Sequence, residues 1–213
     1  SKARYSMSFP SSITTGIQNV LVGSQAGDSL TDADYNTAVG MNALTADTLG
    51  SNSTAIGNGA LASQNFTSAT ASLNVAVGNS AGNSVTTGIQ NTLIGHSAGD
   101  GITTGLRNTA LGFSALGGAV DDGNYNTCIG ADAGLVTTGS QNTFVGAYDP
   151  STGGCGELVT TGSKNTILGA YNGNQGGLDI RTSDNNIVLS DGDGNPRMKI
   201  DGDGRVVINL SLI

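Results

Sequence analysis

The chain has 213 residues, of which 34 are Gly and only 4% are aromatic, with no Trp, so a conventional core of bulky side chains is excluded. Sixteen acidic residues against eight basic ones give a net charge of −8, and no Lys or Arg occurs between Arg4 and Arg107. A surface so poor in cations excludes the phosphate contacts of a nucleic-acid-binding protein and attraction to anionic lipid. No apolar run approaches the roughly 20 residues that cross a bilayer, so we expect no membrane insertion.

After an N-terminal connector, expected over residues 1–16, one short string recurs along residues 17–180, the predicted shaft. Variants of NTAVG end at a Gly nine times, 16 to 23 residues apart, and a degenerate copy, NIVLS, ends at Ser190. The repeat is anchored by an Asn at its first place and a Gly at its fifth: Asn19, Gly23, Asn36, Gly40, Gly57, Asn74, Gly78, Asn91, Gly95, Asn108, Gly112, Asn126, Gly130, Asn142, Gly146, Asn165 and Gly169. Such self-similarity is typical of a solenoid or fibre, in which each unit buries its apolar face against the next.

Each five-residue string is predicted to be a strand, because it is rich in Val, Ile and Thr and lies between Asn and Gly. Alternation places the Asn and the second residue after it on one face, and the first and third residues on the other. The third place holds a large aliphatic residue in every repeat, from Val22 to Leu189, which predicts the inner face of the stack. The second place, from Leu21 to Val188, is also apolar. Apolar residues on both faces predict that each strand is covered twice, most simply by another copy of the same chain.

The rest of each repeat is predicted to be a tight turn. An Ala follows the anchor Gly by three residues in seven repeats, from Ala26 to Ala133, which indicates a close approach of backbones. Five turns use TTG, whose Gly is expected to reverse the chain through a positive φ: Gly16, Gly88, Gly105, Gly139 and Gly162. We expect the anchor Asn residues to stack as a ladder whose amides satisfy one another and neighbouring carbonyls.

Three segments break the period, at 63–73, 147–160 and 171–180, and such insertions are the predicted places for recognition. Solenoids often bind through insertions, and aromatic rings stack on sugars while Asn and Asp hydrogen-bond their hydroxyls. The candidate contacts with a host surface glycan or protein are Tyr148, Asp149, Tyr171, Asn172 and Asn174. The alternative is that these segments only fill the assembly.

Residues 181–213 follow a different pattern, in which three short alternating strands are separated by Asp-Gly turns. This pattern predicts an antiparallel meander that closes the end of the stack. The fold class is therefore predicted to be all-β, as a repetitive parallel β-roll or an intertwined triple β-helix in a homotrimeric fibre with a C-terminal β-meander cap.

The Asp-Gly runs resemble a metal site only in part. Asp191, Asp193 and Asn195 copy the start of a calcium loop, but Pro196 and Gly202 stand where that loop requires Gly and Glu. A hairpin turn is the preferred interpretation, with a weak cation site between neighbouring chains as the alternative. We expect no resident metal.

No constellation has the pattern of a catalytic site. The acidic pairs Asp32 with Asp34 and Asp121 with Asp122 fall in polar turns, which lack the cleft and the burial of a glycosidase. We therefore expect no enzymatic activity and no cofactor. The two cysteines, Cys128 and Cys155, are expected to be unpaired thiols, as is typical of assembly in a reducing cytoplasm.

The repeat NTAVGMNAL and the segment NIVLSDGDGNPRMKIDGDGRVVIN resemble the shafts of bacteriophage tail fibres and other virion fibres, especially those of marine and cyanobacterial phages. The resemblance covers residues 17 to about 209. It implies a homotrimer on the particle surface that is joined to other virion proteins of the tail or capsid, contributes to host attachment, and is assembled in the host cytoplasm. The repeat is also similar to the head repeats of trimeric bacterial adhesins, so the head of a cell-surface adhesin is the alternative function. Because the sequence lacks coiled-coil heptads, the virion fibre is favoured.

An ice-binding solenoid is a further alternative that the Thr-rich turns suggest. The Thr positions, however, are not expected to form one regular flat array.

Overall fold

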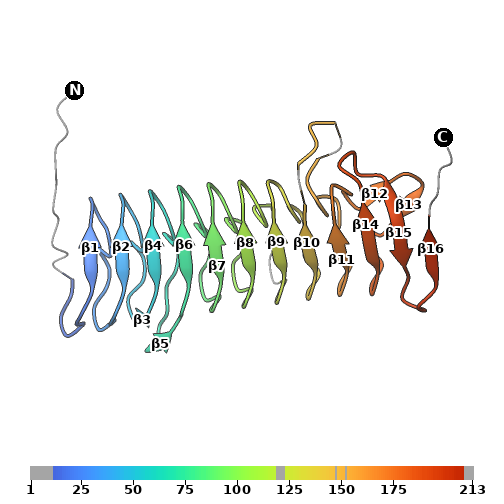
Figure 1. Ribbon diagram of the computed structural model, residues 1–213. Coiled ribbons are helices and arrows are strands. Elements are labelled where there is room, and N and C mark those ends of the chain that lie inside the picture. The colour runs from blue at the N-terminus through green and yellow to red at the C-terminus, as the bar shows by residue number, and fades with distance from the viewer. Residues whose placement is uncertain (1–11, 119–122, 147, 152, 209–213) are drawn as a thin grey trace, which may run out of the picture.

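The computed structural model describes residues 12–118, 123–146, 148–151 and 153–208, and it is a β-solenoid of about ten turns (Figure 1). The predicted all-β class with parallel stacked strands is confirmed, and the described residues contain no helix. Most of the expected connector, the pair Asp121 and Asp122, and the last five residues of the chain lie outside the described residues.

One sheet contains twelve strands, in the order β1-β2-β4-β6-β7-β8-β9-β10-β11-β14-β15-β16. Its strands are β1 (Val20–Val22), β2 (Thr37–Val39), β4 (Thr54–Ile56), β6 (Val75–Val77), β7 (Thr92–Ile94), β8 (Thr109–Leu111), β9 (Thr127–Ile129), β10 (Thr143–Val145), β11 (Thr166–Leu168), β14 (Ile187–Ser190), β15 (Pro196–Ile200) and β16 (Val206–Ile208). Two small sheets pair β3 (Gly50–Ser51) with β5 (Thr70–Ala71) and β12 (Asn174–Gln175) with β13 (Leu178–Asp179).

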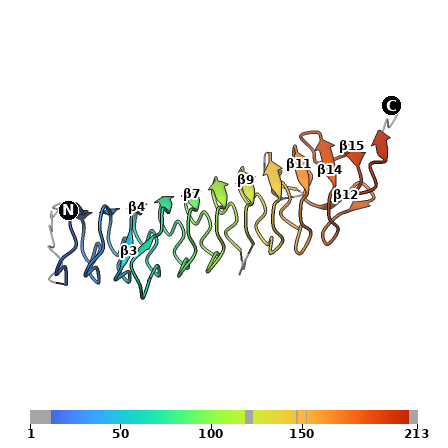
Figure 2. The ribbon, with the colours of Figure 1, turned by 90° about the horizontal axis from the view of Figure 1, so that it is seen from below.

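The strands from β1 to β14 are parallel and stack in exact sequence register, so that Thr37 pairs with Thr54, and Val39 with Ile56. Figure 2 shows these strands in one row along one side of the coil, with the rest of every turn on the other side. At about 4.8 Å per strand, ten parallel strands give a rod about 50 Å long. The stacking explains why the repeat tolerates so little variation, because each residue sits above its own equivalent.

Every turn enters its strand through a residue in the left-handed region. The residue before the anchor Asn, or before Ser53 in its place, has a φ between 53° and 64° in all ten repeats: Gln18, Tyr35, Asn52, Leu73, Gln90, Arg107, Tyr125, Gln141, Lys164 and Asn185. The TTG glycines do not take this role, which corrects the expectation from sequence. A Cβ at Gly105 would lie 2.7 Å from the carbonyl oxygen of Gly123 in the next turn, so these glycines are required by close approach.

The anchor glycines combine both constraints. Gly95 has a φ of 139°, and a Cβ on it would overlap the backbone of Gly112 one turn along. The same φ range, 115° to 143°, recurs at eight of the anchors. Only Gly is suited to this backbone conformation, and the backbone of the next turn leaves no room for a Cβ.

The interior lies on the opposite face of the strands from the one predicted. The second place of the repeat is half-buried at Leu21 in the first turn and buried in every later turn, for example Ala38, Leu93 and Phe144, all 0% exposed. The third place faces outward instead, with Leu111 at 44% exposure. The sequence correctly predicted that the two places lie on opposite faces of the strand, but it exchanged the inner face with the outer one. The physical reason is the narrowness of the coil, which leaves room for Ala but not for a row of large aliphatic side chains on every level.

Two interior places compensate one another in size. Where the second place is Ala, the fourth residue after the anchor Gly is Leu in three of four turns, the exception being Ala76 with Gly82, and where the second place is large, that residue is usually Gly. The pairs are Ala38 with Leu44, Ala55 with Leu61, Ala110 with Leu116, Leu21 with Gly27, Leu93 with Gly99 and Cys128 with Gly134. A Cβ at Gly99 would come within 2.6 Å of the Leu93 side chain, so the two places share one volume.

The anchor Asn side chains form a ladder, but mainly through the backbone of the next turn. Asn91 Oδ1 accepts the backbone N–H of Asn108 at 2.9 Å, and Asn91 Nδ2 donates to the Gly105 carbonyl at 2.9 Å. Equivalent pairs of bonds join the other rungs between Asn74 and Asn165. A direct bond between amides occurs at the end of the row, from Asn186 Nδ2 to Asn165 Oδ1 at 2.9 Å. Each rung thus pairs two backbone groups that the buried strand would otherwise leave unsatisfied.

At the turn where Ser53 takes the place of the anchor Asn, the buried polar groups are paired by a different set of side chains. Gln64 Nε2 donates to Asp47 Oδ2 at 2.6 Å and to Ser53 Oγ at 3.1 Å, while its Oε1 accepts from Asn74 at 2.8 Å. Ser72 Oγ lies 2.6 Å from Ser53 Oγ. All five side chains are buried. The insertion at 63–73 therefore supplies a polar cluster where the ladder lacks an Asn.

After β14 the sheet continues as an antiparallel meander of β14, β15 and β16. The two connecting turns have the same internal bonds, in which Asp191 and Asp201 each accept N–H groups from the residues two and four places on. This arrangement agrees with the three strands and Asp-Gly turns expected from the sequence.

Candidate functional site: the exposed sheet face

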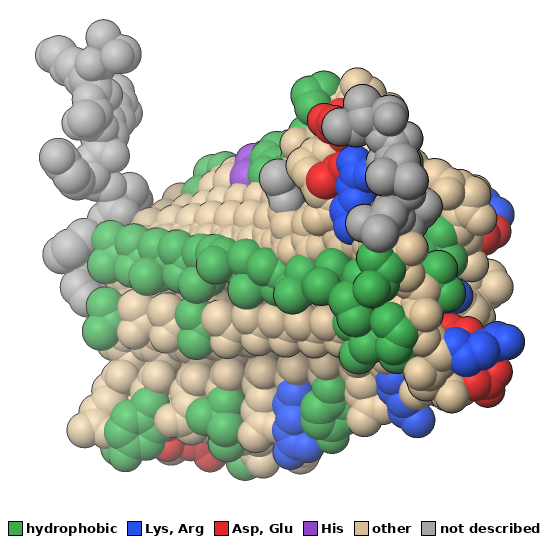
Figure 3. Space-filling view, turned by 45° about the vertical axis from the view of Figure 1, so that its right-hand side comes forward, with side chains coloured by type: hydrophobic (Ala, Val, Ile, Leu, Met, Phe, Trp, Pro, Cys, Tyr) green, Lys and Arg blue, Asp and Glu red, His purple; other side chains and the backbone are tan. Residues whose placement is uncertain are grey.

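The outer face of the shaft carries one continuous row of aliphatic side chains, which we call the aliphatic row. Its most exposed members, at 37% to 44% exposure, are Val22, Ile56, Ile94, Leu111, Leu168 and Leu189. The other members, Val39, Val77, Ile129 and Val145, are half-buried. In Figure 3 the aliphatic row is the unbroken hydrophobic band along the molecule. A monomeric protein rarely exposes an apolar strip that continues over ten strands.

A second row runs beside it on the same face, at the first place of each strand, and we call it the threonine row. Its members are Val20, Thr37, Thr54, Val75, Thr92, Thr109, Thr127, Thr143, Thr166 and Ile187. Because the strands are in register, the seven threonines lie in one row, which Val75 interrupts between Thr54 and Thr92.

The apolar face widens at the C-terminal meander. Ile200 and Val206 continue the threonine row from Ile187, and Met198 and Ile208 continue the aliphatic row. Val206 and Ile208 are 54% and 61% exposed. Two aliphatic rows thus lie side by side where the shaft has one.

Two columns of mostly exposed side chains flank this face. One is the left-handed residue before each anchor Asn or Ser53, and the other is the residue after the anchor Gly in the first seven repeats, from Ser24 to Ala131. In the first column, Arg107 donates to Gln90 Oε1 at 2.6 Å and to the Tyr125 hydroxyl at 2.7 Å, with its guanidinium 5.4 Å from the Tyr125 ring centre. In the second, the rings of His96 and Phe113 stack 5.2 Å apart. Both columns therefore present ordered side chains to the surroundings.

The candidate host contacts are divided between the surface and the interior. Tyr148 is 47% exposed and Asn174 is exposed, whereas Tyr171 is fully buried and donates its hydroxyl proton to the Leu178 carbonyl at 2.8 Å. Burial is the main reason why the pKa of Tyr171 is raised above its ordinary value. Asn172 is also buried, 7% exposed, and its Oδ1 accepts the N–H of Asn174. Tyr171 and Asn172 are thus interior residues, and surface contact is open to Tyr148, Asp149 and Asn174.

The burial of Tyr171 follows from the backbone. The carbonyl of Tyr171 accepts the N–H of Gly156, and that of Cys155 accepts the N–H of Gly134, which is how the interior Ala residues bond between other turns. Cys155 and Tyr171 therefore occupy the interior place of Ala133. The string GCGELVTTG matches SAGNSVTTG, and this internal similarity could have revealed that the outer insertion is confined to residues 147–153.

The remaining candidate sites have ordinary structural roles. Asp34 Oδ1 accepts the backbone N–H of Ile17, and Asp32 accepts the Thr15 hydroxyl. Asp191 is paired with Arg197, and Asp201 with Arg205. Among the described residues, no three His, Cys, Asp or Glu side chains gather in a way that could hold a metal ion. No helix there has the length and apolarity to span a bilayer.

Both cysteines are buried and unpaired. Burial raises the pKa of the Cys155 thiol to about 12 and raises that of the Cys128 thiol well above its usual range. Neither thiol is therefore a reactive nucleophile in the folded chain.

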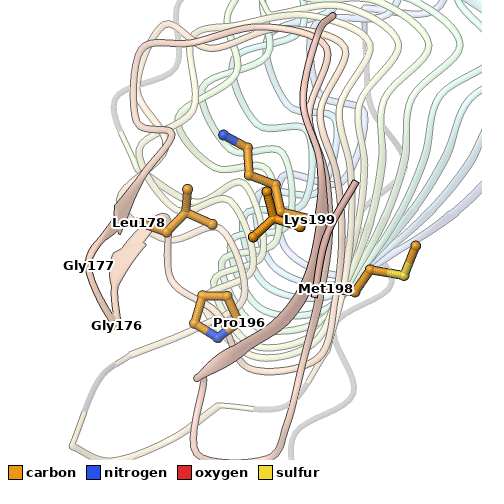
Figure 4. A pocket seen from close by; sticks show the side chains of 7 residues that line it. Gly176, Gly177, Leu178, Pro196, Met198 and Lys199 are labelled. Atoms are coloured by element: carbon orange, nitrogen blue, oxygen red, sulfur yellow. The ribbon is translucent and has the colours of Figure 1, made fainter. Parts of the chain in front are cut away.

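One groove of about 360 Å³ lies between the hairpin β12–β13 and the strands β15 and β16. Leu178 and Lys199 face each other across it, while Met198 points to the other side of β15 (Figure 4). The groove is lined by Gly, Pro and apolar side chains, with Lys199 as the charged residue of the lining. One charged side chain among apolar ones does not make a specific polar binding site.

No protein-family model, curated protein or solved structure matches this chain. The functional argument therefore depends on the residues and their geometry alone.

Proposed function

We propose that this chain is a structural fibre protein of a virion, in which three copies form a rod that contributes to host attachment. The observation that carries the proposal is the aliphatic row, exposed along the whole solenoid of a single chain. Covering a half-exposed Leu or Ile stabilises an assembly by about 1 kcal/mol. The ten members of the row, six of them Leu or Ile and four Val, together supply a large driving force for association, and a rod with one apolar face suits three copies around an axis.

The proposed fibre has three parts, as the sequence pattern indicates: a connector, the shaft, and a C-terminal meander that caps the stack. It is assembled in the host cytoplasm and is joined to tail or capsid proteins of the particle. The exposed residues Tyr148 and Asn174 and the half-buried Asp149 are the proposed contacts with a host glycan or protein. Three chains in one fibre, and several fibres on one particle, convert weak contacts into lasting attachment.

The oligomeric state is the first test. Sedimentation should give three times the chain mass of 21.1 kDa. The double substitution Ile94→Asp and Leu111→Asp should yield monomers, because it buries charge in the aliphatic row. Thr87→Asp, at an exposed position in a turn, is the matched control and should leave the trimer intact. A wild-type monomer would contradict the proposal.

Location on the particle is the second test. Gold-labelled antibody against the shaft should decorate virions, and Tyr148→Ala should weaken particle binding to host cells. Label on a bacterial surface would instead favour the adhesin head, which shares the trimeric rod. A monomer that shapes ice crystals would instead favour an ice-binding solenoid, for which the threonine row is the candidate surface.

A further inference from the structure

We propose that the two flanking columns meet between neighbouring copies, level by level, so that they fix the register of the three chains. The left-handed column of one copy contacts the column after the anchor Gly of the next copy at the same turn. This inference rests on the proposed trimer, and it adds which surfaces touch and which residues pair.

The dimensions of a parallel strand place the corners of a trimer at these columns. Packed sheets lie about 10 Å apart, so a sheet that lines a common axis lies about 5 Å from it. Three flat faces at that distance enclose a triangle with sides of about 17 Å. From the anchor Asn to the anchor Gly the chain covers about 13 Å, and from one flanking column to the other about 20 Å. The corners therefore fall just outside the strand, at the flanking columns.

Rotational symmetry fixes which edges meet. Around a threefold axis the interface is heterologous, so the start of each strand in one copy adjoins the end of a strand in the next. Closed symmetry also keeps equivalent residues of the three copies at one height. The residue before Asn of a given turn then faces the residue after Gly of the same turn in the neighbouring copy.

The residues at these places match in chemistry at several levels. Tyr35 faces Met41, and both are large apolar groups with more than half of their surface exposed, 55% and 52%. A thioether against an aromatic ring is a favourable contact. One level on, Asn52 faces Asn58, and both amides are exposed. Two amides can donate to and accept from each other.

The match continues in the middle of the shaft. Arg107 faces Phe113, which is 56% exposed, so a guanidinium lies opposite an aromatic ring. Tyr125 faces Ala131, a large side chain opposite a small one. Leu73 and Asn79 do not match, so the register is set by the other levels.

Cysteine cross-linking tests the pairing directly. In Asn52→Cys with Asn58→Cys, the two positions lie about 20 Å apart within one chain, far beyond the reach of a disulfide. Oxidation should therefore link different copies and give a covalent trimer on a non-reducing gel. The native thiols are buried in both this variant and its control, so they contribute the same background.

The matched control is Asn52→Cys with Asn79→Cys, which moves one partner to the next turn in the same column. It should give little or no covalent trimer. Tyr125→Cys with Ala131→Cys is a second matched pair, in case the first does not fold, and should behave like the first.

The outcomes separate the two proposals. A trimer in sedimentation whose same-level pairs do not cross-link, or whose control cross-links better, overturns the level-by-level pairing and leaves the trimer standing. A monomer in sedimentation overturns the trimer itself and the pairing with it.

Discussion

The regular turns between β6 and β11 and the irregular turn at Ser53 pair their buried polar groups in two different ways. In the regular turns one buried Asn pairs an N–H and a carbonyl of the next turn. At Ser53 the side chain is too short, and Asp47 forms a cluster there with Gln64 and Ser72 of the insertion at 63–73. The comparison teaches that a coil of this kind requires its buried polar groups to be paired, but not by a particular residue.

The largest expected effect does not depend on the kind of rung. Gly95→Ala in a regular turn and Gly57→Ala beside Ser53 should each lower the free energy of unfolding by about 4 kcal/mol or prevent folding. The φ angles are 139° and 135°, and a Cβ at either place would lie 2.2 Å from a carbonyl oxygen of the next turn. Urea denaturation measures this. Gly192→Ala, where a Cβ meets nothing within 4 Å, should be nearly neutral. A mild effect at Gly95 would refute the role of close backbone approach.

The loss of a regular rung comes next. Asn91→Ala should cost about 3 kcal/mol, because it leaves the Asn108 N–H and the Gly105 carbonyl unpaired in a buried site. Thermal unfolding of Asn91→Ala and Asn108→Ala is the measurement. Unchanged stability in both would contradict the ladder.

A double-mutant cycle sharpens the comparison at the irregular turn. Gln64→Ala should cost about 2 kcal/mol, since it leaves buried groups of Asp47 and Asn74 without this partner. In the background Ser53→Asn the same substitution should cost less, because the new amide can restore a regular rung in the space that Gln64 vacates. Additive effects would show that the cluster does not replace the rung.

A smaller effect tests the size compensation inside the coil. Ala110→Leu should destabilise by about 2 kcal/mol through overpacking against Leu116. Ala110→Leu with Leu116→Gly copies the pair Leu93 and Gly99, and should recover most of the loss; Gly also suits the φ of 49° at position 116. If the double variant is as unstable as the single one, the two places do not share a volume.

The smallest effect is a dependence on alkaline pH, to which the buried thiols and the buried phenol of Tyr171 contribute. Because the pKa of Cys155 is raised to about 12 from 9.0, the folded chain keeps a proton that the unfolded chain loses above pH 9. Stability therefore falls as pH rises from 9 towards 12, by about 2 kcal/mol at pH 10.5 from this thiol. Cys128→Ala with Cys155→Ala, compared with wild type at pH 8 and 10.5, should reduce the fall. An equal fall in both would assign it to other groups.

The sequence by itself determined the period, the strands and their register. Identical strings at near-constant spacing can stack only on their own equivalents, and alternation then decides which residues share a face. It also indicated the anchor Asn and Gly residues, because a position that varies so little within one chain is constrained at every level.

Only the tertiary structure decided which face lies inside. Both faces are apolar, so hydrophobicity could not distinguish Leu111 from Ala110, although the compensation between Ala110 and Leu116 carries that information. The burial of Tyr171 was missed for a similar reason. The Gly- and Asn-rich sequence around it predicted a surface loop, although Tyr171 takes the place of an interior Ala. The width of the coil settles both cases, because close packing admits only the side chains whose volumes sum to the space between turns.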